Sequence, residues 1–284
     1  MIVSIASGKG GTGKTTLALN LAEVARGRVR LLDCDVEEPN DHLFFRGVVE
    51  GSEVVNMPVP GIDESLCDGC GECSAFCAYN ALATIASTTI VFPEMCHGCG
   101  GCMRICPRGA ITEVDHRIGT IEKVRSGEKE LVYGRLDVGV PMAPPLIRKV
   151  KELRGDAPLT ILDAPPGTSC PVISAIRGSD HVLLVTEPTP FGLNDLELAV
   201  EMTLELGIPF GVVVNRAGSG DDRVERFCRG RGIRITAEIP DDRRIAEAYS
   251  RGELAVNAVP GYREMFEGIL DSIEASWRAP EERR

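Results

Sequence analysis

Apolar runs of strand length alternate with segments of helical spacing along most of this chain. Buried strands are predicted at residues 2–6, 29–33, 159–163, 181–186, 210–215 and 233–238. Helices are predicted at residues 15–25, 193–206, 222–229, 243–250 and 262–277. Because apolar strands that alternate with helices form a mostly parallel sheet covered on both faces, the pattern predicts an α/β fold. Ligands of such a sheet bind at the carboxyl ends of its strands.

The alternation stops between Asp63 and Val114, where short turns rich in Cys and Gly take its place. Eight of the 11 cysteines fall there, between Cys67 and Cys106. We therefore predict a small inserted α+β domain at residues 63–114 and a main domain formed by residues 1–62 and 115–284. Residues 118–145 contain several Gly and Pro, so they are expected to form a short hairpin or a loop that returns to the main domain.

Composition and charge narrow the class of protein. The chain has 31 Lys and Arg against 42 Asp and Glu, a net charge of −11. This balance argues against a general nucleic-acid binder, which gains affinity by neutralising phosphate. The first residues lack the basic region of a signal peptide, and the apolar runs are too short to cross a bilayer, so we expect a cytoplasmic protein without membrane insertion. Cysteines in that compartment bind metal or do chemistry and do not form a disulfide scaffold.

The loop after the first predicted strand fits the phosphate-binding pattern G-x-x-x-x-G-K-[ST], and a predicted helix follows it. Its glycines let backbone N–H groups surround phosphate oxygens at a helix N-terminus. Lys14 is expected to reach the β- and γ-phosphates, and the Thr15 hydroxyl is expected to bind Mg²⁺. An ordinary glycine-rich turn is the alternative. The residues predicted to contact the nucleotide here are Gly8, Gly10, Gly11, Thr12, Gly13, Lys14, Thr15 and Thr16.

Lys9, the second residue of this loop, makes it resemble the deviant Walker A motif of the MinD/ParA/nitrogenase-iron-protein superfamily. In that family the early lysine crosses a dimer interface and touches the nucleotide of the partner. The resemblance therefore implies an ATP-dependent homodimer with Lys9 in this role. A solvated lysine is the alternative reading.

Three further motifs resemble elements of the same family, in the same order. Asp33-Cys34-Asp35 is similar to switch I, which implies that Asp35 positions the attacking water. The segment from Asp163 to Gly167 is similar to Walker B and switch II, which implies that Asp163 lies near Mg²⁺ and Gly167 near the γ-phosphate. Asn215 is in the place of the residue that contacts adenine, and Pro240 is a weaker candidate for the same pocket. Taken alone, an Asp at a strand end is more often a helix cap.

The inserted segment repeats one cysteine spacing twice. Cys67-x₂-Cys70-x₂-Cys73-x₃-Cys77 and Cys96-x₂-Cys99-x₂-Cys102-x₃-Cys106 are copies of the bacterial ferredoxin run, in which the fourth cysteine binds the other cluster. The spacing predicts one [4Fe–4S] cluster on Cys67, Cys70, Cys73 and Cys106 and another on Cys96, Cys99, Cys102 and Cys77. Zinc is the competing ion.

Some residues around these runs carry further expectations. Cys106 is followed by Pro107 but Cys77 is followed by Ala78, so we expect altered local packing there without loss of a cluster. His97 is expected to be solvated or hydrogen-bonded rather than a ligand. Cys34 and Cys228, outside the runs, are expected to be small buried residues.

Nearly the whole chain resembles MinD-superfamily ATPases that contain an inserted ferredoxin domain. This resemblance implies an ATP-binding and ATP-hydrolysing protein whose nucleotide-dependent dimerisation is coupled to an electron-transfer module with a redox or other protein partner. One alternative is an iron–sulfur carrier or assembly ATPase, although those relatives use a C-terminal C-x-x-C that this chain lacks. Another is a MinD/ParA-like ATPase of spatial organisation, with the clusters as sensor or docking module.

The last predicted helix is compared with the C-terminus of MinD. MinD ends in a basic amphipathic helix that binds lipid, whereas the end of this chain is acidic up to Glu281 and Glu282. We therefore expect this helix to pack on the main domain and not on a membrane.

Overall fold

The computed structural model describes residues 1–278, which divide into two compact units. Unit 1 comprises Met1–Ser52, Ile121–Arg135 and the described chain from Ile147 onward, and unit 2 comprises Glu53–Thr120 and Leu136–Leu146. The predicted insert, residues 63–114, falls within unit 2. The acidic residues Glu281 and Glu282 lie outside the described residues.

A nine-stranded sheet has the order β11-β10-β9-β1-β8-β2-β7-β6-β3. Parallel pairing joins neighbours from β11 through to β7, and β6 and β7 are joined by a tight turn at Gly127. The strands are β1 (Ile2–Ala6), β2 (Val29–Asp33), β3 (Val48–Ile62), β6 (Ile111–Ser126), β7 (Lys129–Leu136), β8 (Leu159–Asp163), β9 (His181–Thr186), β10 (Phe210–Ala217) and β11 (Ile235–Pro240). The central strands are buried on both faces, as parallel strands require.

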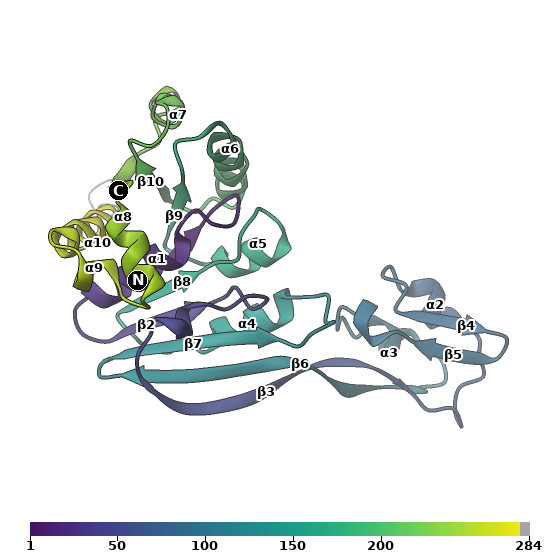
Figure 1. Ribbon diagram of the computed structural model, residues 1–284. Coiled ribbons are helices and arrows are strands. Elements are labelled where there is room, and N and C mark those ends of the chain that lie inside the picture. The colour runs from purple at the N-terminus through teal and green to yellow at the C-terminus, as the bar shows by residue number, and fades with distance from the viewer. Residues whose placement is uncertain (279–284) are drawn as a thin grey trace. The chain divides into compact units, whose positions relative to one another are not determined.

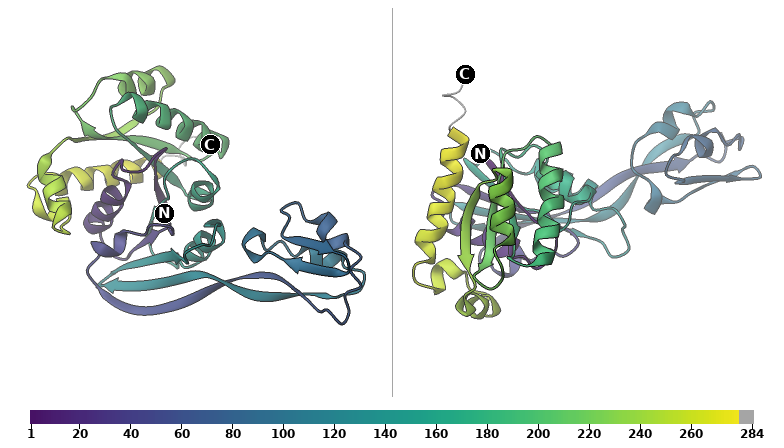
Figure 2. Two further views of the ribbon diagram at one scale, coloured as in Figure 1. Left: turned by 45° about the vertical axis from the view of Figure 1, so that its right-hand side comes forward. Right: turned by 90° about the horizontal axis from the view of Figure 1, so that it is seen from above.

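Helices cover both faces of this sheet in unit 1 (Figures 1 and 2). On one face lie α1 (Lys14–Val24), α9 (Ala255–Ala258) and α10 (Tyr262–Arg278), and on the other lie α5 (Cys170–Ile176) and α6 (Pro190–Glu205). Ile5, Leu17 and Phe266 belong to one buried apolar cluster, so β1, α1 and α10 share a core. The remaining helices of unit 1 are η1 (Asp41–Leu43), α4 (Pro144–Glu152), which begins in unit 2, α7 (Arg223–Arg231) and α8 (Arg243–Ser250).

The predicted α/β fold with a mostly parallel sheet is confirmed. β1, β2, β8, β9 and α8 span the predicted residues, and the other predicted elements differ by at most a few residues at their ends. The C-terminal helix packs on the core of unit 1 as expected, through five buried side chains from Tyr262 to Ile273, although Trp277 is 46% exposed. No helix in the described part of the chain is long and apolar enough to cross a membrane.

The prediction of a short hairpin or loop at residues 118–145 was wrong in extent. The long strands β6 and β7 and the start of α4 occupy this region, and β7 joins the main sheet beside β2. The sequence also missed β3. The reason is that the apolar alternation of β3 is limited to Val55, Met57 and Val59. The strand also contains Gly51, Pro58, Pro60 and Gly61, which are typical of turns. Proline is tolerated there because β3 is an edge strand.

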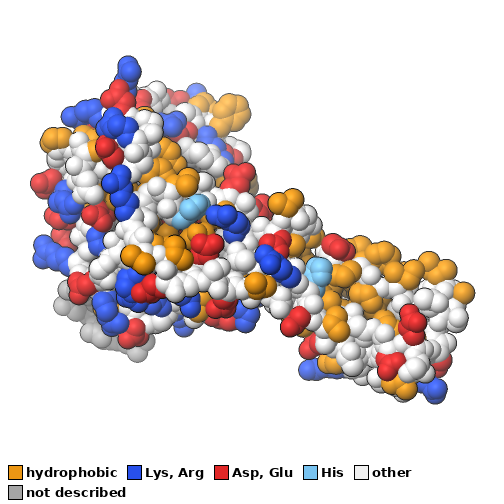
Figure 3. Space-filling model, turned by 60° about the horizontal axis from the view of Figure 1, so that its bottom comes forward, with side chains coloured by type: hydrophobic (Ala, Val, Ile, Leu, Met, Phe, Trp, Pro, Cys, Tyr) orange, Lys and Arg blue, Asp and Glu red, His pale blue; other side chains and the backbone are white. Residues whose placement is uncertain are grey.

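Unit 2 contains two short helices and a separate antiparallel hairpin. The helices are α2 (Glu72–Phe76) and α3 (Gly101–Ile105), the hairpin is β4 (Leu82–Ile85) with β5 (Thr88–Val91), and η2 (Pro93–Met95) follows. The helices begin alike, each after a glycine in the left-handed conformation, Gly71 and Gly100. Apolar side chains are visible on the surface of unit 2 in Figure 3. Its exposed apolar residues include Phe76, Tyr79, Ile85, Ile90, Phe92, Met95 and Met103.

Candidate functional site

The loop between β1 and α1 has the backbone of a phosphate-binding loop. Gly11 and Gly13 have φ values of 78° and 95°, a region that favours glycine. A Cβ atom added to Gly13 would also lie 2.4 Å from Asn215 Nδ2, and one added to Gly8 would lie 2.2 Å from the carbonyl oxygen of Asp195. Gly8 and Gly13 therefore allow β10 and α6 to approach the loop closely.

A cavity of about 480 Å³ opens beside this loop in unit 1. It brings together the predicted residues Gly10, Gly11, Gly13, Lys14, Thr15, Thr16, Asp35, Asn215 and Pro240. The predicted residues Gly8, Lys9, Thr12, Asp163 and Gly167 do not line it. Asp163 is nevertheless one hydrogen bond away, because Thr15 Oγ1 donates to its Oδ2 at 2.6 Å. The Gly167 amide donates to the Ser7 carbonyl at 3.0 Å, which ties switch II to the start of the loop.

Lys14 is buried at the N-terminus of α1, where its Nζ donates to Ser7 Oγ at 3.0 Å. Burial lowers the pKa of this ammonium, while the nearby carboxylates of Asp163 and Asp35 act in the opposite direction. Asn215 Nδ2 donates to the carbonyl oxygen of Thr12 at 2.8 Å. The two side chains expected to contact phosphate and base are thus bound to the loop itself.

Strand register places two aspartates side by side at the carboxyl ends of β2 and β8. Asp33 and Asp163 are direct partners in the parallel ladder, and both are buried. Asp33 accepts backbone hydrogen bonds from Asp35, Asn40 and Asp41, so it holds the chain after β2 in place. Burial and the charges of Asp163 and Asp35 raise the pKa of Asp33 well above its usual value, against the backbone hydrogen bonds that it accepts.

Asp163 has the features of a residue that lies near a cation. Its Oδ1 is buried without a hydrogen-bond partner among the described residues. Burial raises its pKa to about 7, against the hydrogen bond from Thr15 and the charge of Lys14. Burial also raises the pKa of Asp35 to about 6. An orphaned carboxylate oxygen beside a threonine hydroxyl is a donor set that suits Mg²⁺, a hard cation with oxygen ligands.

The cavity beside the phosphate-binding loop also contains residues that the sequence did not indicate. Ile245 and Tyr249 of α8 and Phe266 of α10 form part of its wall, and Asn40 lies at the switch I side. Ile245 and Tyr249 are four residues apart, so the sequence does show that they share one face of a helix. Their orientation toward the cavity depends on tertiary packing, since Tyr249 contacts the ring of Phe44 at 4.4 Å between centroids.

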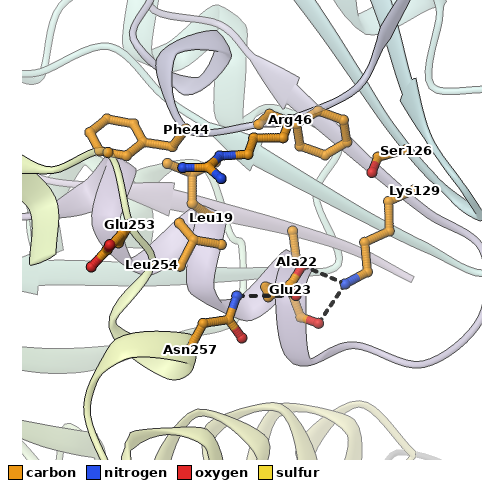
Figure 4. Close-up of a pocket in the computed structure, with 12 residues that line it drawn as sticks. Leu19, Ala22, Glu23, Phe44, Arg46, Ser126, Lys129, Glu253, Leu254 and Asn257 are labelled. Atoms are coloured by element: carbon orange, nitrogen blue, oxygen red, sulfur yellow. Dashed lines mark hydrogen bonds and ion pairs between the residues drawn. The ribbon is translucent and has the colours of Figure 1, made fainter.

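A second cavity in unit 1, of about 340 Å³, lies beside α1 and is lined by Phe44, Arg46 and Leu254 among others (Figure 4). The Glu23 carboxylate accepts hydrogen bonds from Lys129 Nζ at 2.7 Å and from Asn257 Nδ2 at 3.4 Å. None of the residues predicted from the sequence as nucleotide or metal ligands lines this cavity.

The eight cysteines of the two runs separate into two cavities of unit 2. One cavity is lined by Cys67, Cys70, Cys73 and Cys106. The other is lined by Cys77, Cys96, Cys99 and Cys102. Each cavity thus contains three cysteines of one run and the fourth cysteine of the other run.

The turns after the two crossing cysteines match. The amide of Ala81 donates to Cys77 Sγ at 3.3 Å, and the amide of Ala110 donates to Cys106 Sγ at 3.4 Å. A further amide, from Gly98, donates to Cys96 Sγ at 3.4 Å. The backbone hydrogen bond after Cys77 therefore forms as it does after Cys106, without the proline. The altered packing around Ala78 stays a prediction.

The structure also locates His97 of unit 2 and the two cysteines of unit 1 for which burial was expected. His97 is exposed and stacks on Tyr79 with 3.6 Å between ring centroids. Cys34 and Cys228 are buried as expected. Among the described residues, no group of three or more His, Cys, Asp or Glu side chains comes close enough to hold a metal ion. Four cysteine sulfurs around one zinc ion lie close together, because each Zn–S bond is only about 2.3 Å long. In a [4Fe–4S] cluster each cysteine binds a different iron atom, so the cysteine sulfurs lie farther apart.

Comparisons with known proteins agree with the phosphate-binding loop and the α/β fold of unit 1. The model of the CobQ/CobB/MinD/ParA nucleotide binding domain matches residues 3–256. An uncharacterized protein of Methanocaldococcus jannaschii is 32% identical over 264 residues, which are 89% of this chain and 90% of that protein. An iron-sulfur cluster carrier protein of Aquifex aeolicus is 25% identical over 282 residues, 91% of this chain and 62% of the carrier. The septum site-determining protein MinD of Pyrococcus horikoshii, solved with Mg-ADP, has a TM-score of 0.57 and 21% identity, covering 96% of this chain and 95% of that chain.

Proposed function

Because the chain belongs to the CobQ/CobB/MinD/ParA nucleotide-binding family of P-loop ATPases, we propose that it hydrolyses ATP as a nucleotide-dependent homodimer and couples this cycle to electron transfer. The observation that carries the redox part is the division of eight cysteines between two cavities, each with one cysteine from the other run. In this proposal residues 1–62 and 115–284 form the ATPase and residues 63–114 carry the clusters.

The ATPase chemistry is assigned to residues of the nucleotide cavity. Phosphoryl transfer needs positioning and charge neutralisation more than covalent help from the protein. Backbone amides of the loop and Lys14 bind the phosphates, Thr15 and Asp163 hold Mg²⁺, and Asp35 orients the attacking water. Mg²⁺, when bound, neutralises charge on the phosphates. Lys9 supplies a further positive charge to the nucleotide of the partner subunit.

The proposed cluster ligands are the two cysteine sets that share a cavity. [4Fe–4S] clusters carry single electrons when bound to such sets. The amides of Ala81, Gly98 and Ala110 that donate to cysteine sulfur support this assignment, because such hydrogen bonds stabilise negative charge on a cluster.

Coupling requires ATP to bind two conformations with different affinity. The test is the ATPase rate and the dimer fraction of anaerobically reconstituted protein, measured with the clusters oxidised and after reduction with dithionite. We expect both quantities to change at least threefold with redox state. Identical values in both states would contradict coupling, whereas absent turnover, or turnover that survives Lys14→Ala, would contradict the ATPase itself.

A second candidate function is delivery of an iron–sulfur cluster as cargo. It is favoured by the similarity to iron-sulfur cluster carrier proteins of several organisms. Two complete ferredoxin-like sets of four cysteines favour permanent clusters instead. Incubation of the cluster-loaded protein with an apo-ferredoxin separates the two functions, since a carrier transfers iron to the acceptor and an electron-transfer protein keeps its own.

A further inference from the structure

Glu187 is a buried carboxylate at the edge of the nucleotide site with no role in the chemistry above. It follows β9 directly and is 8% exposed. Its Oε2 lies 3.4 Å from Lys9 Nζ, and its Oε1 lies 2.8 Å from a guanidinium nitrogen of Arg216. One carboxylate therefore joins the phosphate-binding loop to the residue that follows the adenine-contact candidate Asn215.

The backbone on either side of Glu187 is fixed, so its side chain has a defined position. Thr186 Oγ1 donates to the Gly192 carbonyl at 2.9 Å, and the Thr189 amide donates to the Glu187 carbonyl at 2.8 Å. Thr189 also caps α6, because its Oγ1 accepts a hydrogen bond from the Gly192 amide at 3.0 Å. These bonds lock the turn between β9 and α6.

The two cations differ in their distance from the Glu187 carboxylate. Arg216 has a left-handed φ of 54° at a shift in the β10–β11 register, and its carbonyl accepts two hydrogen bonds from Ser219. The side chains of Lys9 and Arg216 are 31% and 57% exposed, so both are open to solvent. The ion pair with Arg216 is the shorter, 2.8 Å against 3.4 Å, so we treat Arg216 as the partner that stays on Glu187 and Lys9 as the one that exchanges.

We propose that Glu187 is a positioning residue that holds Lys9 in its own subunit and releases it when the dimer closes. This inference rests on the proposed dimer, in which Lys9 must reach the nucleotide of the partner. Release is possible because Arg216 still compensates the carboxylate, and a buried charge left without a partner would be costly. Glu187 thus raises the protein concentration at which ATP drives dimerisation.

The test is the monomer–dimer Kd of the cluster-loaded protein with Mg²⁺ and a non-hydrolysable ATP analogue, measured by sedimentation velocity. Glu187→Gln keeps the shape of the side chain and should lower the Kd about threefold to tenfold. Glu201→Gln is the matched control, because it also replaces a glutamate by glutamine. Glu201 lies on α6, its side chain is 60% exposed, and its carboxylate is 4.0 Å from the Arg231 guanidinium. The control should change the Kd less than twofold.

A second variant has the opposite sign and remains informative if Glu187→Gln folds poorly. In Arg216→Gln the departure of Lys9 would leave Glu187 uncompensated, so the Kd should rise at least threefold at saturating analogue. An unchanged or higher Kd in Glu187→Gln, or an unchanged or lower Kd in Arg216→Gln, would overturn the inference while leaving the dimer intact. Wild-type protein that stays monomeric with the analogue would overturn the proposed dimer as well.

Discussion

At the scale of single residues, the buried carboxylate of Asp163 has a cost to the stability of the ligand-free fold. Burial raises its pKa to about 7, so between about pH 4 and pH 7 the folded protein binds a proton that the unfolded chain has lost. Its contribution to the free energy of unfolding therefore falls as the pH rises through this range. Near a bound cation the same carboxylate would gain the partner that its Oδ1 lacks.

Asp163→Asn should stabilise the ligand-free protein at high pH. The amide keeps an oxygen for the Thr15 hydroxyl and carries no charge, so at pH 8 we expect a gain of about 2 kcal/mol in the free energy of unfolding of unit 1. At pH 5 the wild-type carboxyl is protonated and the gain should largely disappear. Thermal unfolding in EDTA without nucleotide measures both values; a gain independent of pH would show that charge is not its cause. The variant should also lose ATP hydrolysis.

Gly13 offers a test of the close approach between the loop and β10. Gly13→Ala adds a Cβ atom 2.4 Å from Asn215 Nδ2 at a φ of 95°, so either the loop or the Asn215 side chain must move. We expect at least a tenfold loss of ATP-analogue affinity, measured by calorimetry. The control is Gly27→Ala, also at positive φ but with no atom within 4 Å, which should cost about 1 kcal/mol of stability and leave affinity nearly unchanged.

Much of the nucleotide site was predictable because its residues are close in sequence or at strand ends. The loop motif placed Lys14 and Thr15, and parallel pairing placed Asp35 near them. Glu187 and Tyr249 were not predictable, because their roles depend on which strand neighbours β1 and how α8 packs. A charged residue directly after an apolar run is common at the ends of buried strands, so its position alone does not indicate a contact with Lys9.

At the scale of elements, the repeated cysteine runs form matching turns. The fourth cysteines of the runs, Cys77 and Cys106, each accept a hydrogen bond from the backbone amide four residues later. The residue three positions after each of them, Asn80 or Gly109, has a positive φ. The cysteine spacing repeats in the two runs, and short runs leave the backbone little freedom, so matching turns could be expected from the sequence. The spacing could not predict the β6–β7 hairpin, whose stability comes from pairing with distant strands.

Because each cavity contains one cysteine of the other run, two double cysteine substitutions should differ in how much iron the protein retains. Cys70→Ala with Cys106→Ala removes two cysteines of one cavity, so about four iron atoms per chain should remain. Cys70→Ala with Cys77→Ala removes one from each cavity, so both clusters should be damaged and less iron should remain. Iron and sulfide analysis with EPR of the reduced proteins measures this difference. The exposed Cys170→Ala, outside the runs, should retain about eight iron atoms. Equal losses in the two double variants would contradict the crossing.

At the scale of the whole molecule, the two units differ in what stabilises them. The core of unit 1 combines buried side chains from its helices with those of the central strands. In the described part of unit 2, one apolar cluster consists of Cys73, Leu82 and Ile111, with Cys77, Cys102 and Cys106 packed against it. Small domains with little apolar core commonly depend on bound metal. Unit 2 should therefore need its clusters to stay folded, while unit 1 should not.

Hydrogen exchange can separate these two dependences within one chain. After anaerobic removal of iron, amides of β4, β5, α2 and α3 should exchange at least tenfold faster, because the cysteines that surround the cavities no longer share a partner. Amides of β1, β8 and β9 should keep their protection, since their pairing and side-chain core contain none of these cysteines. Mg²⁺ and an ATP analogue provide the internal control, because they should protect the loop before α1 with or without iron. Unchanged exchange in unit 2 would mean that its fold precedes cluster binding, and the cysteines would then be ligands added to a stable scaffold.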